Sequence, residues 1–440
     1  MPEKPETILI RGGRVIDPAS GHDATADVLI EDGCVAAIGP GLGSAAADRV
    51  IEAGDRIVTP GLIDPHVHFR QPGGEHKESI RSGSLAAAAG GFTAVCCMPN
   101  TLPPLDTPEM LASIADRARS ASCRVFVAAC ATAGRKGATP SEIPLLAKAG
   151  AVAFTDDGSA VPTAGVMGKV LALVRETGRV FMQHCEDETL TGGAPMHAGE
   201  LSLRLGLRGW PREAEEITLE RDLRLNRRIG CRYHAQHLSS AGSVELIERA
   251  RAEGQPVSAE VSPHHLTLTV EACAGLDPNA KMNPPLRERH DVEALRDAVA
   301  RGVITVLATD HAPHAREEKA EPFEAAPYGI IGLETALALN AGALVETGLI
   351  GWPRLVALMT IEPARLLGVD EQGLGRLEVG GVADVTIIDP GERWEVCEET
   401  LAGRSVNTPF MGRELTGRAV MTIVGGRVVH DSRALIRAGA

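Results

Sequence analysis

The feature that most constrains the fold is a regular alternation between residues 57 and 370. Continuous apolar runs, typical of strands buried on both faces, are separated by stretches rich in Ala, Leu, Glu and Arg that favour helices. The runs are RIVTPGLIDPHVHF, FTAVCCMPN, CRVFVAACAT, GAVAFTDDG, RVFMQHCED, CRYHAQHLSS, QPVSAEVSPHH and VITVLATDHAPH. Eight β/α units in about 300 residues predict an α/β fold built on a (β/α)8 TIM barrel. An open, doubly wound sheet is the alternative, because alternation alone does not show that the sheet closes.

The two ends of the chain differ from this middle region and resemble each other. TILIRGGRVID at residues 7–17 and MTIVGGRVVHD at 421–431 both read as a strand, a Gly-Gly turn and a second strand. These patterns predict a small, sandwich-like β domain assembled from residues 1–56 and 371–440. The barrel is then expected to occupy residues 57–370.

Composition disfavours several classes of protein. The 440 residues carry a net charge of −14, which argues against nucleic acid or an anionic membrane as partner. No apolar run approaches the length of about 18 residues that spans a bilayer, and the charged N-terminus is unlike a signal or transit peptide. Nine cysteines without a C-x-x-C pair suit reduced thiols. We therefore expect a cytoplasmic protein.

Candidate metal-binding residues stand where the apolar runs end. In a strand His66 and His68 project from the same face, although a lone H-x-H motif often matches by accident. Seven of the eight runs end in such polar residues: His66 and His68, Asn100, Asp156 and Asp157, His184, His237, His264 and His265, and Asp310. In a barrel these ends share one face, where the strand-to-helix loops build the active site. Imidazoles and carboxylates gathered on that face predict a metal centre.

Several motifs carry a resemblance to a known family. The chain resembles the bacterial dihydroorotases of the longer, type I class, within the amidohydrolase superfamily of metal-dependent barrels. The matching motifs are DPHVHFRQPG, MPN, FTDDG, QHCED, EVSPHHL, KMNPPLR, LATDHAPH, PYG and SVNTPF, which together cover nearly the whole length. The resemblance implies a zinc enzyme with one or two ions per subunit, two being favoured.

The resemblance also implies a set of metal ligands. His66, His68 and Asp310 would bind one ion, His184 and His237 a second, and Asp157 would bridge the two. Many relatives use a carboxylated lysine as the bridge, but no lysine lies between Lys148 and Lys169 in this chain. Asp156 is then expected to orient or cap, and His264 and His265 to support the site without binding metal.

The implied reaction is the reversible cyclisation of N-carbamoyl-L-aspartate to L-dihydroorotate in pyrimidine biosynthesis. A metal-held hydroxide would act as the nucleophile and Asp310 as the general acid/base. An arginine fork can bind the substrate carboxylate through two hydrogen bonds, and Arg70 lies two residues beyond His68. The other substrate-binding residues implied are Asn100 and His314 on the carboxylate, and His68, Asn283, Tyr328 and Gly329 on the ring.

Three alternatives compete with this reading. A dihydropyrimidinase, hydantoinase or allantoinase acts on a ring that lacks the carboxylate, and such relatives usually carry the bridging lysine. A non-catalytic dihydroorotase-like subunit of an aspartate transcarbamoylase assembly is expected to have lost metal ligands. A metal-storage protein leaves Arg70 and Asn100 unexplained. A small-molecule substrate, a homodimer and a possible aspartate transcarbamoylase partner are the associations we expect. The charged loop at 311–329 is predicted to be a mobile lid.

Overall fold

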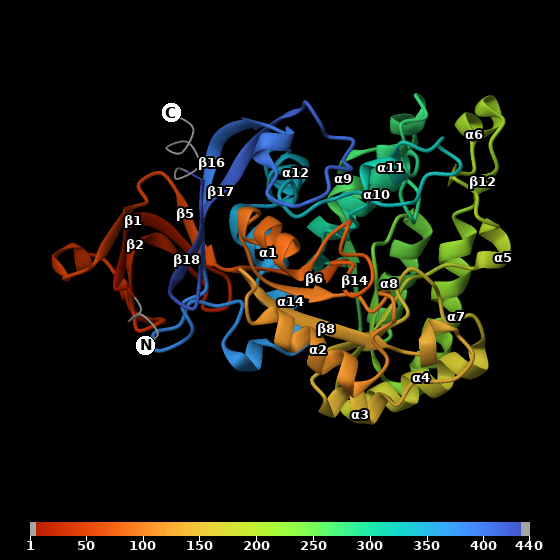
Figure 1. The fold of residues 1–440 in the computed structure, drawn as a ribbon, viewed down its shortest axis with the longest axis horizontal. Coiled ribbons are helices and arrows are strands. Elements are labelled where there is room, and N and C mark those ends of the chain that lie inside the picture. Colours follow the sequence, from red (N-terminus) through yellow and green to blue (C-terminus); the bar gives the residue numbers. More distant parts are fainter. Residues whose placement is uncertain (1–5, 433–440) are drawn as a thin grey trace.

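The computed structural model describes residues 6–432, which form a barrel with a separate sheet at one side (Figure 1). Eight parallel strands pair in chain order around the barrel. They are β6 (Leu62–Val67), β7 (Phe92–Cys97), β8 (Arg124–Cys130), β9 (Ala153–Thr155), β10 (Val180–Gln183), β13 (Arg232–Ala235), β14 (Val257–Val261) and β15 (Val306–Leu307). Each of the eight apolar runs supplies one of them.

The first and last strands meet and close the sheet. A parallel bridge joins Val67 to His311, and the His68 N–H donates to the His311 carbonyl at 2.9 Å. Closure confirms the predicted barrel and excludes the open sheet.

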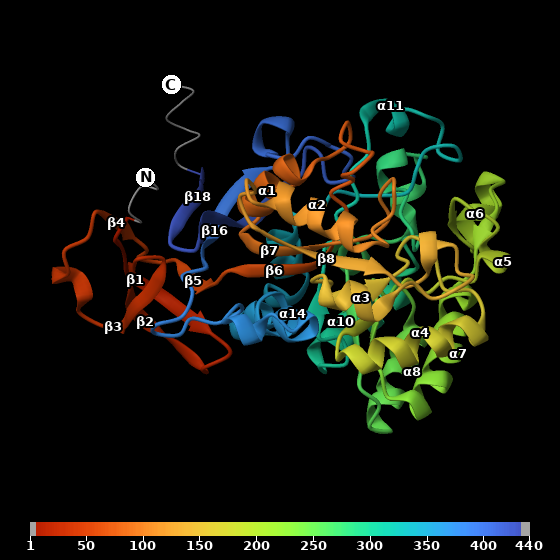
Figure 2. The same cartoon turned by 60° about the horizontal axis from the view of Figure 1, so that its bottom comes forward.

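Helices follow the strands and lie on the outside of the barrel (Figure 2). The main ones are α1 (Ile80–Ala89), α2 (Pro108–Ala118), α3 (Ile143–Lys148), α4 (Ala164–Thr177), α7 (Glu213–Ile229), α8 (Ala241–Ala252), α10 (Arg289–Ala300), α13 (Trp352–Met359) and α14 (Ile361–Leu367). Shorter ones are α5 (Glu188–Thr191), α6 (Glu200–Leu205), α9 (Pro263–Thr267), α11 (Arg316–Lys319) and α12 (Ala336–Asn340). None of the helices within residues 6–432 is long and apolar enough to cross a membrane.

Side-chain caps fix where several of these helices begin. The hydroxyl oxygens of Ser79, Thr163 and Ser240 each accept the backbone N–H three residues further on, at 3.1, 3.4 and 3.1 Å. Such caps satisfy N–H groups that a helix start leaves without partners. Each capping residue is the last residue of a loop that connects a barrel strand to the next helix. The cap therefore fixes where that loop ends, and these loops carry polar residues at the carboxyl end of the barrel.

The barrel interior is apolar toward one end. Side chains such as Ile63, Val180 and Val306 form a buried cluster there together with α14. This packing leaves the opposite end, where the strands finish, as the place where polar side chains gather.

The second sheet is built from both ends of the chain. Its strands run in the order β18 (Arg427–Asp431), β17 (Glu414–Val424), β16 (Val385–Glu395), β5 (Ile57–Pro60), β1 (Ile8–Asp17), β2 (His22–Glu31) and β3 (Cys34–Gly39), with β4 (Arg49–Glu52) beside β1. The pairing of β5 with both β1 and β16 joins the amino-terminal and carboxy-terminal strands into one sheet.

The run RIVTPGLIDPHVHF, which we read as one barrel strand, holds two strands. Ile57–Pro60 belongs to the side sheet, and the barrel begins only after Gly61, a few residues beyond the expected start at 57. A Cβ on Gly61 would meet the Thr93 side chain at 2.0 Å, so glycine allows the chain to pass close to β7 between the sheets. Both strands are buried, and no polar residue marks the break.

Candidate metal centre

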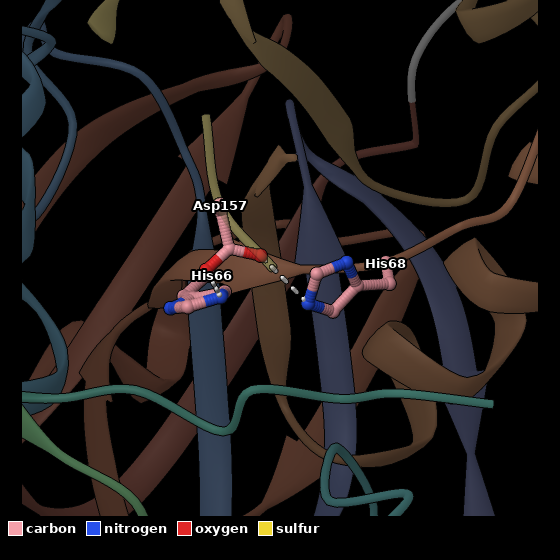
Figure 3. A group of neighbouring side chains, drawn as sticks. All are labelled: His66, His68 and Asp157. Carbon is pink, nitrogen blue, oxygen red and sulfur yellow. Dashed lines mark ion pairs between the residues drawn. The ribbon is translucent and has the colours of Figure 1, made fainter. Parts of the chain in front are cut away.

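His66 and His68 form one side of a buried cluster at the carboxyl ends of the barrel strands. Both project from the end of β6 toward Asp157, which follows β9 (Figure 3). The His66 Nε2 atom lies 3.3 Å from Asp157 Oδ1, and the His68 Nε2 atom lies 3.3 Å from Asp157 Oδ2. The Asp157 carboxylate therefore faces each imidazole with one of its two oxygens.

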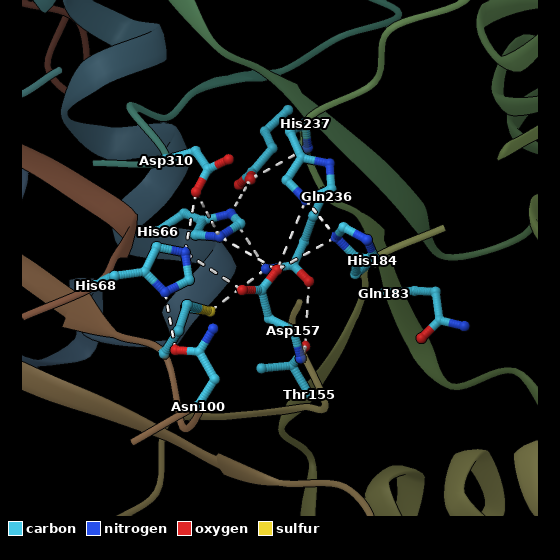
Figure 4. Close-up of polar contacts among 12 residues, drawn as sticks. His66, His68, Asn100, Thr155, Asp157, Gln183, His184, Gln236, His237 and Asp310 are labelled. Atoms are coloured by element: carbon cyan, nitrogen blue, oxygen red, sulfur yellow. Dashed lines mark hydrogen bonds and ion pairs between the residues drawn. The ribbon is translucent and has the colours of Figure 1, made fainter. Parts of the chain in front are cut away.

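The three remaining predicted ligands complete this cluster (Figure 4). His184 follows β10 and His237 follows β13; their Nδ1 and Nε2 atoms lie 3.7 and 3.6 Å from Asp157 Oδ1. Asp310 follows β15, with Oδ1 3.0 Å from His68 Nε2. The structure thus brings together all six side chains that we expected to hold metal, with Asp157 between the two groups of imidazoles.

The atoms at the centre of the cluster have lone pairs and few donors. His66 Nε2 and Asp157 Oδ1 are buried without a hydrogen-bond partner, and His184 Nδ1 and His237 Nε2 lie 2.9 Å apart. Buried polar atoms of this kind are costly unless something binds them. A donor set of four imidazoles and two carboxylates fits divalent cations such as zinc, so these residues fit the expected metal.

The carboxylates of the cluster are held in the charged form. Burial opposes ionisation of Asp157, but His66 and the neighbouring imidazoles outweigh it and hold the pKa of this carboxyl well below its usual value. The pKa of Asp310 is lowered in the same way, because His66 and His68 outweigh burial. Two buried negative charges facing ring nitrogens favour a cation.

Backbone strain accompanies the cluster. His237 and Asp310 have φ values of 31° and 48°, and Arg70 has a φ of 55°. Residues other than glycine rarely adopt this left-handed region, and such strain concentrates at functional sites. The three residues in this region are two expected metal ligands and the arginine expected to bind the substrate carboxylate.

Asp156 points away from the cluster. Its Oδ1 atom accepts the backbone N–H groups of Ala131 and Thr132 at 3.0 Å each, and its Oδ2 atom accepts the Thr132 hydroxyl. Asp156 therefore ties the end of β9 to the end of β8, while its neighbour Asp157 faces the imidazoles.

A cavity of about 200 Å³ adjoins the cluster. It is lined by all seven residues expected to bind substrate: His68, Arg70, Asn100, Asn283, His314, Tyr328 and Gly329. Arg70 donates through Nε to the Pro313 carbonyl at 3.1 Å, and its Nη2 lies 3.5 Å from His314 Nε2. Burial lowers the pKa of Arg70 to about 10, so the guanidinium stays charged at neutral pH.

Some of these groups already have partners inside the protein. The Asn100 Oδ1 atom lies 2.9 Å from His68 Nδ1, so Asn100 also orients a cluster imidazole. The Gly329 N–H donates to the Lys281 carbonyl at 2.9 Å, and His314 Nε2 lies 2.8 Å from the Tyr328 carbonyl. A ligand would have to share these backbone groups or displace their partners.

His264 and His265 are buried beside the cluster, outside the groups of possible ligands among the described residues. His265 Nε2 lies 3.0 Å from the Pro284 carbonyl, and burial lowers the pKa of His264 to about 4. Both imidazoles are therefore suited to the supporting role expected of them.

Sequence reasoning missed two carboxylates behind the cluster. Glu260 Oε1 lies 2.6 Å from His66 Nδ1, and Glu186 Oε2 lies 3.0 Å from His184 Nε2. Each carboxylate accepts the ring N–H and so turns the other ring nitrogen toward the centre. Glu186, two residues after His184 in QHCED, could have been noticed by spacing. Glu260 was recognisable only as an acid inside an otherwise buried strand.

Lysine ammonium groups anchor the loop at 311–329 beside the cavity. Lys319 Nζ donates to the carbonyl oxygens of Pro278 and Pro327 at 2.8 and 2.9 Å. Lys281 Nζ donates to two further carbonyls of the loop at 2.8 and 2.6 Å. The structure thus identifies what holds the loop in place, whereas its predicted mobility stays a prediction.

Replacing Lys319 by methionine is expected to make this loop several-fold more sensitive to limited proteolysis in the absence of ligand, because both carbonyl contacts are lost. A substrate analogue should slow cleavage in both proteins. The exposed Lys136→Met variant serves as the control. Cleavage rates that do not respond to the analogue would contradict a moving lid.

The barrel and the buried histidine–carboxylate cluster define this protein as a metal-dependent amidohydrolase. A family model described as Dihydro-orotase-like matches residues 55–243. A dihydroorotase from Citrifermentans bemidjiense is 46% identical over 426 residues, covering 97% of this chain and 100% of the relative. A dihydroorotase from Pelotomaculum thermopropionicum is 46% identical over 428 residues, covering 97% and 99%. The chain belongs to the dihydroorotase family.

Solved structures show the same fold in related enzymes. The L-hydantoinase (dihydropyrimidinase) from Arthrobacter aurescens superposes with a TM-score of 0.85 at 28% identity, covering 97% of this chain and 96% of that one. The dihydropyrimidinase from Brevibacillus agri also gives 0.85, at 24% identity. The barrel and side sheet are therefore shared with these two solved structures.

Proposed function

We propose that this protein is a dihydroorotase, which reversibly cyclises N-carbamoyl-L-aspartate to L-dihydroorotate. Full-length relatives that carry this name support the proposal. The observation that carries it furthest is Arg70, whose guanidinium lines the cavity next to the metal-binding cluster. A dihydroorotate ring bears a carboxylate that a guanidinium can bind, whereas a hydantoin or dihydrouracil ring lacks it.

We propose zinc as the metal, held by His66, His68 and Asp310 on one side and by His184 and His237 on the other, with Asp157 between them. When bound, the metal supplies a Lewis acid that polarises a carbonyl and makes water acidic. The residues behind the cluster keep the ring nitrogens turned inward. Metal analysis of the purified protein tests both the identity and the number of the ions.

Asp310 is positioned to move the proton in the proposed reaction. Its carboxylate lines the substrate cavity, and its lowered pKa keeps it ionised, which is the form that can accept a proton. In the hydrolytic direction it takes the proton of the attacking water and passes it to the departing ring nitrogen. In the biosynthetic direction it removes a proton from the carbamoyl nitrogen, which attacks the carbon of the protonated side-chain carboxyl group. Asp310 passes that proton to the departing hydroxyl oxygen, so the C–O bond breaks and water leaves.

Arg70, Asn100 and His314 are proposed to bind the carboxylate, while His68, Asn283 and the Tyr328–Gly329 backbone face the ring. Burial and the charge of Arg70 lower the pKa of His314 to about 2, so this imidazole stays neutral. A neutral ring adds no second buried charge beside Arg70, and its one N–H, which faces the Tyr328 carbonyl at Nε2, would have to leave that carbonyl to donate to the anion.

A rate comparison on the zinc-loaded enzyme tests the function. We expect kcat/KM for dihydroorotate to exceed that for 5,6-dihydrouracil by about 30- to 1000-fold, the value of a charge-assisted contact worth about 2 to 4 kcal/mol. Faster turnover of dihydrouracil would favour a dihydropyrimidinase. Absence of turnover with bound zinc would favour a non-catalytic subunit.

We further propose that the enzyme is a cytoplasmic homodimer and that an aspartate transcarbamoylase is a candidate partner. The reduced thiols support this location, since the nine cysteines of the chain are all free in the structure. Light scattering measures the oligomeric state. Full activity of the purified chain alone would show that catalysis needs no partner.

A further inference from the structure

A buried row of hydrogen-bonded side chains lies behind the metal-binding cluster. Ser258 Oγ is 2.8 Å from His234 Nδ1, His234 Nε2 is 3.0 Å from Glu260 Oε2, and Glu260 Oε1 is 2.6 Å from His66 Nδ1. His66, His234 and Glu260 are all 0% exposed. The row crosses from β14 to β13 and back before it reaches β6.

The carboxylate of Glu260 has no arginine or lysine partner among residues 6–432, which is unusual for a fully buried acid. Its partners are the His66 ring, the His234 ring and the backbone N–H of His237, the last at 3.3 Å. Burying a carboxylate is costly because the charge loses its hydration. An apolar residue of the same size would fill the space at a lower cost in free energy. Its position against two of the proposed ligand residues suggests another role.

We propose that Glu260 is a positioning residue for both halves of the metal centre, and that His234 holds it in place. This inference rests on the proposed metal-dependent function. A neutral imidazole carries one N–H, and a carboxylate at Nδ1 requires that proton there. The Nε2 lone pair of His66 then faces Asp157. Without the carboxylate, the proton could move to Nε2 and block the position where a metal binds.

The contact with His237 extends this role to the second group of ligands. His237 has a φ of 31°, a conformation that few residues other than glycine adopt. The hydrogen bond from its backbone N–H to Glu260 helps to hold this conformation and so places the imidazole near Asp157. The other two imidazoles have separate supports, Asn100 behind His68 and Glu186 behind His184.

The test measures zinc affinity of the full-length protein by competition with a chromophoric chelator, and the absorption spectrum of the cobalt-substituted protein. Glu260→Gln keeps the shape and removes the charge. We expect zinc affinity to fall by about 10- to 100-fold, as is usual when a carboxylate behind a metal-binding histidine is lost. The cobalt spectrum should change, because the ligand geometry at His66 changes.

Two substitutions at His234 provide a graded second test, which also covers the case in which Glu260→Gln does not fold. His234→Leu removes the donor to Glu260 and should weaken zinc binding. His234→Gln can donate one N–H in its place and should recover much of the affinity. If His234 only filled space, the glutamine variant would bind zinc no better than the leucine variant.

The control is Asp384→Asn, which alters a buried carboxylate that pairs with Arg124 at the junction of barrel and side sheet. It should lower stability without changing zinc affinity. If the wild type binds no zinc, the proposed function fails and this inference fails with it. If the wild type binds zinc while Glu260→Gln matches it in affinity and cobalt spectrum, or Asp384→Asn weakens binding equally, the inference alone is overturned.

Discussion

Replacing His66 and His68 together by alanine is expected to remove the more tightly bound metal and to abolish turnover. Both imidazoles face Asp157 at 3.3 Å from the end of one strand, and His68 also approaches Asp310 at 3.0 Å. Their loss removes two of the four protein ligands proposed for that ion, the other two being Asp310 and the bridging Asp157. Of the four imidazoles in the cluster, the two buried carboxylates would then keep only those of His184 and His237 near them, which leaves their charges poorly balanced.

Metal content per folded subunit and dihydroorotate hydrolysis are the two measurements for this double variant. The exposed His76→Ala change is a suitable control, since it removes an imidazole without touching the cluster. Retention of full zinc together with full activity would show that the metal lies elsewhere. Loss of activity with full zinc would instead restrict these two side chains to substrate binding.

Arg70→Ala is expected to lower kcat/KM for dihydroorotate by about 30- to 1000-fold while leaving metal content unchanged. Arginine is permanently cationic and cannot ligate zinc, so its removal acts on the substrate alone. In the cavity its Nε is engaged by the Pro313 carbonyl, which holds the terminal nitrogens in a fixed orientation. Preorganisation of this kind limits the entropy lost when the carboxylate binds.

Two further measurements make the Arg70 prediction specific. Arg70→Lys should recover only part of the activity, because a point charge does not reproduce the planar pair of donors. The variant Arg70→Ala should also lose most of the preference for dihydroorotate over 5,6-dihydrouracil. A normal rate with dihydroorotate, or zinc loss proportional to the lost activity, would contradict a carboxylate-binding role.

The barrel was largely predictable because its strands are buried on both faces and therefore stand out as apolar runs. All eight runs supply a strand, and the expected ligands at the ends of five of them converge as barrel geometry requires. The first run misled us over where the barrel starts. β5 and β6 are both fully buried, so only Gly61 separates a strand of one sheet from a strand of the other.

The side chains at the strand ends were predictable from the sequence. The carboxylates that support the ligand histidines from the side away from the centre were missed. Asp156 and Asp157 could be ranked only by family resemblance, since adjacent acids give no sign of which one faces inward. The hydrogen bonds from Ala131 and Thr132 supply the physical reason. Glu260 lies within a strand, where its role depends on which residue of a neighbouring strand lies beside it, and strand pairing is not written in local sequence.

The side sheet cannot form completely until late in translation. The strand β5 pairs with β16, which leaves the ribosome only after the whole barrel has been made. Until then the amino-terminal strands carry an open edge that could pair with another nascent chain. Since β5 runs through Gly61 directly into the strand bearing His66, β16 also completes the sheet from which that strand emerges.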